Sequence, residues 1–295
     1  MNWIKGLVFC VAAICIFSGI SYAGELFFPQ VADGTSGDTS WRTTLVLSNT
    51  EYSSASVTIA FIQDDGTPMN VTVRARTSGW REQTGSVFQF TLYPIGYLQI
   101  ETTGTGNMKT GWARVQSDKS IGGISIFSLY IDGNFINDVG APATEAKNAF
   151  SFLVEKRTGI NTGIVIANPN ASQVMPMLIL RDAGGFIVAG PSYLPIPANG
   201  HVQKYVTELF SQEDVPSDFQ GILEVMGVLN GMVGMGVRQR ELDFTWLPVI
   251  PQDGDPIFRE LSASVHRLQE QGGFLGLCGD FRFLPTNAGE PLVSD

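Results

Sequence analysis

A short apolar stretch that ends on an asparagine occurs twice in this sequence, and the repetition constrains the fold more than any other feature. Residues 43–49 read TTLVLSN and residues 162–168 read TGIVIAN, which puts Asn49 and Asn168 119 positions apart. Val57, Ile59 and Phe61, which follow the first stretch, recur with the period of two that indicates a half-buried strand. Internal similarity at so long a period predicts two copies of one domain, not a solenoid of short repeats.

Further segments recur in the same order. FTLYPIGYLQI (90–100) is similar to YLPIPANGHVQKY (193–205), and GWARVQS (111–117) is similar to GILEVMG (221–227). Asp65-Gly66 and Gly184-Gly185 are turn signals of the hairpin type. Each copy offers about seven short strands, which bury one face each when two sheets pack together. We therefore predict an all-β chain with two tandem immunoglobulin-like antiparallel β-sandwich modules, at residues 24–145 and 146–250.

The first 23 residues have the pattern of a secretory signal peptide. Lys5 precedes an apolar run from Leu7 to Phe17, and small residues lead up to Ala23. An uncleaved membrane anchor is the alternative, but the apolar run is well short of the ~20 residues that a span requires. Cleavage would leave Cys278 as the one cysteine, either free or in a disulfide between chains.

The C-terminal residues do not belong to the repeat. Residues 251–295 begin with a turn-rich linker, and Ile257, Leu261, Val265 and Leu268 then follow at helical spacing. We expect a short amphipathic helical tail that packs on the second module or docks on a partner.

Composition limits the partners. The formal net charge of −10 disfavours nucleic acid and anionic lipid as main partners. After signal cleavage no membrane span is expected. The chain is therefore predicted to be secreted, periplasmic or on the cell surface.

The two copies differ in length at two places. The first carries an additional polar stretch near Arg74–Val87, which holds Arg74, Arg76, Trp80 and Arg81. Loops on a rigid scaffold often carry binding sites, and an exposed indole flanked by guanidinium groups suits a sugar ring or an interface. We assign a candidate ligand-binding site to these four residues. The alternative is a longer hairpin with a folded-back Trp80 and solvated arginines.

The second copy has its own insertion before Gly221. The segment VTELFSQEDVPSDF (206–219) predicts a short helical turn capped by Thr207. Leu209 and Phe210 are expected to cover one end of the sandwich.

The usual signatures of catalysis are missing from the sequence. It contains two histidines, His201 and His266, and no nucleophile elbow, zinc motif or phosphate-binding loop. We expect a non-enzymatic protein with no cofactor and no metal site, although a carboxylate pair is an alternative that only the fold can test. The acidic segment DGNFIND (132–138) is interpreted as a turn and not as a calcium site.

The segments FFPQVADG, WRTTLVLSNT, GWARVQSD and GGISIF, with the turn at Leu92, Pro94 and Gly96, resemble a group of secreted bacterial tandem β-sandwich repeat proteins. The resemblance covers about residues 25–250 and implies a bacterial envelope or extracellular setting. It implies no activity and carries over no functional residue. The second copy departs from the pattern where Ile222 and Glu224 replace Trp112 and Arg114.

Together these observations predict a secreted, non-enzymatic binding module that contacts a surface glycan or an envelope protein. The alternative is a structural or assembly subunit of the bacterial envelope or extracellular matrix, in which strand edges and the tail contact partners. The sequence leaves the oligomeric state open.

Overall fold

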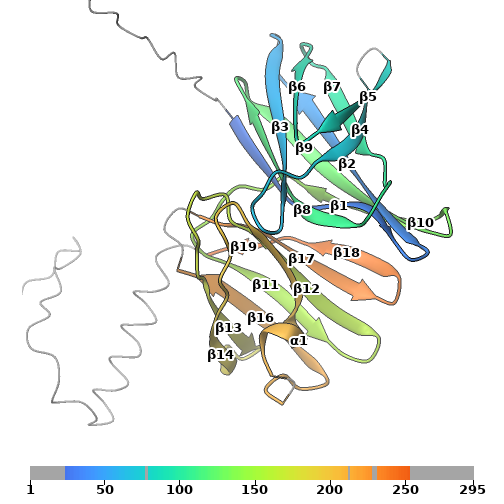
Figure 1. The fold of residues 1–295 in the computed structure, drawn as a ribbon. Coiled ribbons are helices and arrows are strands. Elements are labelled where there is room, and N and C mark those ends of the chain that lie inside the picture. The colour runs from blue at the N-terminus through green and yellow to red at the C-terminus, as the bar shows by residue number, and fades with distance from the viewer. Residues whose placement is uncertain (1–23, 77–78, 212, 228–230, 253–295) are drawn as a thin grey trace, which may run out of the picture. The chain divides into compact units, whose positions relative to one another are not determined.

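The computed structural model describes residues 24–76, 79–211, 213–227 and 231–252. The predicted signal peptide, tail helix and Cys278 lie outside these residues and stay predictions. The described residues from Gly24 to Pro251 belong to one compact unit (Figure 1). Within the described part of the chain, no helix has the length and apolarity needed to cross a membrane.

The first half of the chain is built from strands alone. They are β1 (Gly24–Ser36), β2 (Thr39–Asn49), β3 (Ala55–Gln63), β4 (Val71–Arg76), β5 (Trp80–Gly85), β6 (Val87–Leu92), β7 (Tyr97–Thr102), β8 (Lys109–Ser117), β9 (Ile121–Ile131) and β10 (Asn134–Pro142).

The second half adds one short helix. Its elements are β11 (Phe150–Lys156), β12 (Ile160–Ala167), β13 (Met177–Asp182), β14 (Ile187–Tyr193), β15 (His201–Tyr205), α1 (Val206–Leu209), β16 (Phe219–Met226), β17 (Val233–Arg240), β18 (Asp243–Leu247) and β19 (Ile250–Pro251). The prediction of an all-β chain is confirmed. The predicted helical turn is confirmed as α1, but the capping residue is Tyr205 and not Thr207, because the Tyr205 N–H donates to Glu208 Oε2 at 2.7 Å.

The antiparallel strands of each half lie in two layers. In the first half, one layer has the order β1–β8–β3–β6 and the other the order β5–β4–β7–β2–β9–β10. Strand β1 takes part in both layers, since its start pairs with β8 and its end with β2. In the second half the orders are β14–β13–β16–β11–β19 and β15–β12–β17–β18. A separate apolar core fills each half, around Phe28, Leu45 and Ile59 in the first and Phe152, Ile164 and Leu223 in the second.

The strand order differs from that of an immunoglobulin domain. There the second strand lies between the first and the fifth, and the third lies beside the sixth. In the second half the second strand, β12, lies between β15 and β17, and the first strand, β11, pairs with β16. The prediction of an immunoglobulin-like order finds no support in this arrangement.

Asn49 and Asn168 occupy the same kind of place in the two halves. The Asn49 amide donates to Ser53 O at 2.7 Å and to Tyr93 O at 3.1 Å, and its Oδ1 accepts from the Glu51 N–H at 3.0 Å. Asn168 makes the corresponding bonds to Ser172 O at 2.8 Å, Pro197 O at 2.7 Å and Asn170 N at 3.0 Å. Each buried amide thus satisfies backbone groups of two turns that no strand ladder reaches, which explains why an asparagine ends both apolar stretches.

The additional stretch of the first half begins and ends next to the same residue, Phe61 of β3. The Phe61 N–H donates to Ser86 O at 2.9 Å, and the Met69 N–H donates to Phe61 O at 2.9 Å. Between these two contacts the chain crosses to the other layer, where it forms the hairpin of β4 and β5 next to β7. The longer loop predicted around Arg74–Val87 is therefore a two-stranded extension of a sheet.

Two apolar clusters join the halves. One combines Phe27 and Trp112 with Ala167 and Val233, and the other combines Phe127 and Ala141 with Val165 and Met235. Both faces of β12 are consequently buried, one in the core of the second half and one against the first half.

Candidate binding site

The four residues assigned to a binding site from the sequence lie on the β4–β5 hairpin. Arg76 and Trp80 face each other across the two strands, as do Arg74 and Glu82. Trp80 is about half exposed at 52%, and the Arg76 guanidinium lies 5.8 Å from the centre of its ring. Arg81 lies opposite Ala75, on the other face of the hairpin. The structure thus brings three of the four residues together and leaves out Arg81.

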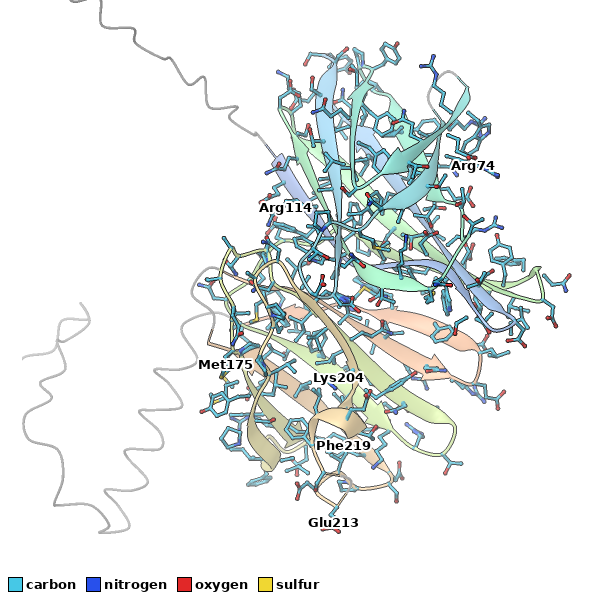
Figure 2. The ribbon with its side chains drawn as sticks, viewed as in Figure 1. Arg74, Arg114, Met175, Lys204, Glu213 and Phe219 are labelled. Carbon is cyan, nitrogen blue, oxygen red and sulfur yellow. The ribbon has the colours of Figure 1, made fainter. Side chains whose placement is uncertain are left out.

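Cross-strand contacts engage the polar groups of this hairpin. Arg74 Nε lies 3.3 Å from Glu82 Oε2 in an exposed ion pair, and Figure 2 shows Arg74 on the β4–β5 side of the first half. Thr72 and Thr84 share a hydrogen bond of 2.9 Å on the same face. Cross-strand pairs of this kind stabilise a two-stranded ribbon without any ligand. The binding role of Arg74, Arg76, Trp80 and Arg81 stays a prediction.

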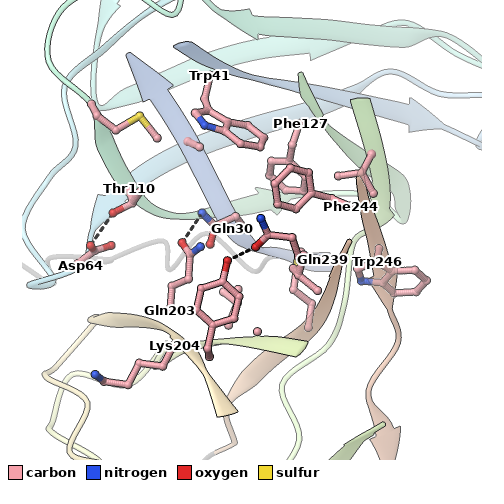
Figure 3. A pocket seen from close by; sticks show the side chains of 18 of the residues that line it. Gln30, Trp41, Asp64, Thr110, Phe127, Gln203, Lys204, Gln239, Phe244 and Trp246 are labelled. Atoms are coloured by element: carbon pink, nitrogen blue, oxygen red, sulfur yellow. Dashed lines mark hydrogen bonds between the residues drawn. The ribbon is translucent and has the colours of Figure 1, made fainter. Parts of the chain in front are cut away.

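A groove between the two halves offers a larger concave surface. Its volume is about 460 Å³, within the usual range of ligand pockets. Strands β1, β2, β8, β9 and β10 of the first half line it together with β12, β15, α1, β17 and β18 of the second (Figure 3). We call this surface the interdomain groove. It is lined by Gln30, Ala32, Trp41, Asp64, Met108, Thr110, Phe127, Val139, Gly163, Val165, Gln203, Lys204, Tyr205, Glu208, Met235, Val237, Gln239, Phe244 and Trp246.

One part of the interdomain groove is aromatic. Trp41 and Phe244 meet edge to face with ring centres 5.4 Å apart, and Trp246 and Phe127 belong to the adjoining apolar cluster. Figure 3 shows Trp41, Phe127 and Phe244 gathered on one side of the groove. Flat aromatic faces of this kind provide apolar contact area, while the indole N–H groups remain available as donors.

Amide side chains also line the groove, and one of them, Gln239, lies across the β17–β18 pair from Phe244. The Gln30 amide donates to Gln203 Oε1 at 3.1 Å, and the Tyr205 hydroxyl donates to Gln239 Oε1. Burial, together with the Glu208 carboxylate, raises the pKa of Tyr205, so its hydroxyl remains a donor over the physiological range. Gln30 Oε1 also contacts His201 and Gln239 Nε2 donates to Glu241 O at 2.9 Å, so the exposed Gln203 amide has the most donor capacity left for a ligand.

The charged groups near the groove are paired. Asp64 Oδ1 lies 2.8 Å from His201 Nδ1, and Thr110 donates to Asp64 Oδ2 at 2.6 Å. Burial opposes ionisation of Asp64, but the hydrogen bonds from His201 and Thr110 outweigh it and lower the pKa of the carboxyl. Lys204 Nζ lies 4.0 Å from Glu208 Oε1. A ligand therefore meets mainly aromatic and neutral polar groups.

The His201–Asp64 pair is placed as a structural contact. The His201 side chain is fully buried, and its second ring nitrogen lies 3.1 Å from Gln30 Oε1. Both nitrogens are therefore engaged, and neither is free to take a proton from a bound molecule. The pair instead connects the Asp64–Gly66 turn of the first half to β15 of the second.

Among the described residues, no three side chains of His, Cys, Asp and Glu converge in a way that could hold a metal ion. Asp132 and Gly133 form the turn between β9 and β10, with positive φ of 49° and 74°, and residues 134–138 belong to β10. The interpretation of the segment as a turn therefore holds for its first two residues, and the rest of it is strand.

The sequence contained one signal for the interdomain groove that period-two reasoning does not use. GIVIAN (163–168) and GMVGMG (231–236) are buried at every residue. An unbroken apolar run of this length is typical of a strand covered on both faces. These two runs mark the face of the second half that packs on the first.

The sequence matches no protein-family model, and comparison with curated proteins and with solved structures gives no match either. The residues and geometry of the chain itself therefore carry the functional inference.

Proposed function

We propose that this protein is an exported, non-enzymatic binding protein that holds a segment of an uncharged glycan in the interdomain groove. The observation that carries the proposal is that the same groove is lined by aromatic side chains, Trp41, Phe244 and Trp246, and by glutamine amides. Sugar rings present flat C–H faces beside hydroxyl groups, so they require both kinds of surface. The paired charges of Asp64 and Lys204 favour a neutral ligand over an anionic one.

We further propose that the two halves are copies of one β-sandwich module. Equivalent strand orders support this, since β1–β8–β3–β6 corresponds to β11–β16–β13–β14 and β7–β2–β9–β10 corresponds to β15–β12–β17–β18. The matching hydrogen bonds of Asn49 and Asn168 support it as well. In this alignment β4 and β5 of the first half lack a counterpart, and α1 and β19 lack one in the second. The groove is then a site that neither copy forms alone.

The test is a glycan array probed with the purified protein, followed by calorimetry on the best ligand. Trp246→Ala should weaken binding about tenfold or more, because it removes an aromatic contact of the groove. Trp80→Ala, on the β4–β5 hairpin, is the matched control and should leave the affinity unchanged. Loss of binding in the Trp80→Ala protein alone would move the site to the hairpin. Capture of an envelope protein without any glycan binding would overturn the ligand class.

A further inference from the structure

One turn of the second half sits on the first half and joins the two by backbone contacts. The Trp112 indole N–H donates to Asn199 O at 2.8 Å, and Arg114 donates to Pro169 O at 2.6 Å. The His201 N–H donates to Asp64 O at 2.9 Å. We call residues 169–171 and 197–201 the docking turn of the second half. The receiving face of the first half consists of Asp64–Gly66, Trp112 and Arg114.

The first half has a turn with the same backbone. Ile95 and Asn199 both have φ of 54°. The Ile95 N–H donates to Glu51 O at 3.0 Å, as the Asn199 N–H does to Asn170 O at 2.9 Å. The corresponding docking turn of the first half, residues 50–52 and 93–97, is nevertheless exposed and apolar. Its large side chains are exposed by 92% at Tyr52, 68% at Tyr93, 58% at Ile95 and 56% at Tyr97.

The second half likewise has an exposed counterpart of the receiving face. Gly111 pairs with Gln63 next to Trp112, and Gly221 pairs with Asp182 next to Ile222, so Ile222 stands in the place of Trp112. Trp112 is fully buried, whereas Ile222 is 37% exposed beside the exposed Leu153 on the neighbouring strand. Phe186, which follows the turn at Gly184-Gly185, is also exposed. The chain therefore exposes a docking turn with large apolar side chains in its first half and a receiving face around Ile222 in its second half. These two surfaces correspond to the pair of surfaces through which its own halves are joined.

We propose that copies of this chain associate head to tail, with the Tyr93–Tyr97 turn of one copy on the Ile222 face of the next. The contact would repeat between chains the one made within each chain, and the inference rests on the proposal that the halves are copies of one module. Two different surfaces meet, so the interface is heterologous and adds further copies until it closes into a ring or continues as a filament.

The residues that differ between the inner and outer contacts favour a second copy as the occupant. Within the chain, the docking turn itself is held by hydrogen bonds, as in the pairs of Asn199 with Trp112 and His201 with Asp64. The alignment puts Ile95 against Ile222 and Tyr97 against Ala183 in the outer contact, so apolar pairs stand at its centre, while Glu224, at the position of Arg114, is paired with Arg181 of its own sheet. An isoleucine at positive φ is strained, and such strain is found where a side chain is held for function. Aromatic and apolar side chains are the ones enriched in interface centres.

The experiment measures mass in solution by sedimentation velocity over a wide range of protein concentration, without glycan. The wild-type protein should grow in mass with concentration, and more so as salt screens its net charge of −10. Ile95→Lys and Ile222→Lys should each remain monomeric. An equimolar mixture of the two variants should form a capped 1:1 dimer, because one retains the receiving face and the other the docking turn.

Two further variants keep the test independent of folding. Ile95→Asn copies the residue of the second half and should fold while weakening association about tenfold or more. Leu242→Lys changes a side chain of similar exposure, 50%, on neither surface and should associate like the wild type. A wild type that stays monomeric at all concentrations would overturn the proposal, and so would a mixture that stays monomeric. Trp246→Ala separates this result from glycan binding, since it should associate normally.

Discussion

Replacement of Trp112 by alanine tests the packing of the two halves directly. The Trp112 side chain is fully buried, lies in an apolar cluster that both halves share, and donates its indole N–H to Asn199 O at 2.8 Å. Large-to-small changes of a buried tryptophan cost about 3–5 kcal/mol. The change also leaves Asn199 O without its donor, so we expect a loss near the upper end of that range, about 4–5 kcal/mol.

Urea unfolding followed by circular dichroism measures this loss. Each half has its own core, so Trp112→Ala should also separate one cooperative transition into two as the contact between the halves weakens. Trp80→Ala is the matched control, because the same residue type is half exposed on the β4–β5 hairpin. It should change the free energy of unfolding by about 0.5 kcal/mol or less. Equal losses in the two variants would refute the reasoning, since the halves would then not pack through Trp112 in solution.

Three further changes probe single features. Gly66→Ala should destabilise the contact between the halves, because φ at Gly66 is +87° and the new Cβ would lie 2.1 Å from Ala198 O. The variant should be cleaved faster by a protease between the halves, and an unchanged cleavage rate would contradict this prediction. Asp64→Asn should lower stability near neutral pH. The pKa of Asp64 is lowered in the folded state, despite burial, by hydrogen bonds that include one from His201, so its contribution is present above the ordinary aspartate pKa of about 3.9 and disappears as the pH falls through the lowered value. Urea midpoints of the two proteins should therefore converge in acid, and a constant gap would argue against this role. Ile95→Asn should raise the free energy of unfolding by about 1 kcal/mol, because asparagine adopts positive φ more readily, and a melting temperature that falls would show that the turn is unstrained.

The sequence predicted the strands better than it predicted their neighbours. The period-two pattern at Val57, Ile59 and Phe61 depends only on local geometry, and these side chains do face the core. Pairing depends on contacts between distant segments, and the expectation of an immunoglobulin-like order finds no support in the observed pairing. The capping residue of α1 was also missed, because Glu208 bonds the Tyr205 N–H and starts the helix before Thr207.

The candidate site illustrates the same limit. Trp80 and the polar residues of the Arg74–Val87 stretch predicted a binding loop, but cross-strand pairing there engages Arg74 with Glu82. The interdomain groove combines residues more than 150 positions apart, such as Gln30 and Gln203. No local pattern reports such a meeting, and only the doubly buried runs at 163–168 and 231–236 hinted at a covered face.

Because Phe61 contacts both Met69 and Ser86, the segment between these two residues is a place where another peptide could be inserted into the first half. Met69 and Ser86, which precede and follow residues 70–85, both hydrogen-bond to Phe61. If residues 70–85 were removed, a short linker could therefore join the two ends and continue the chain along β3. The closing entropy of a replacement grows only slowly with its length. The excision also removes Val71, Val73 and Ala75, which are buried in the core of the first half, so an inserted segment has to supply apolar side chains in their place beside β7.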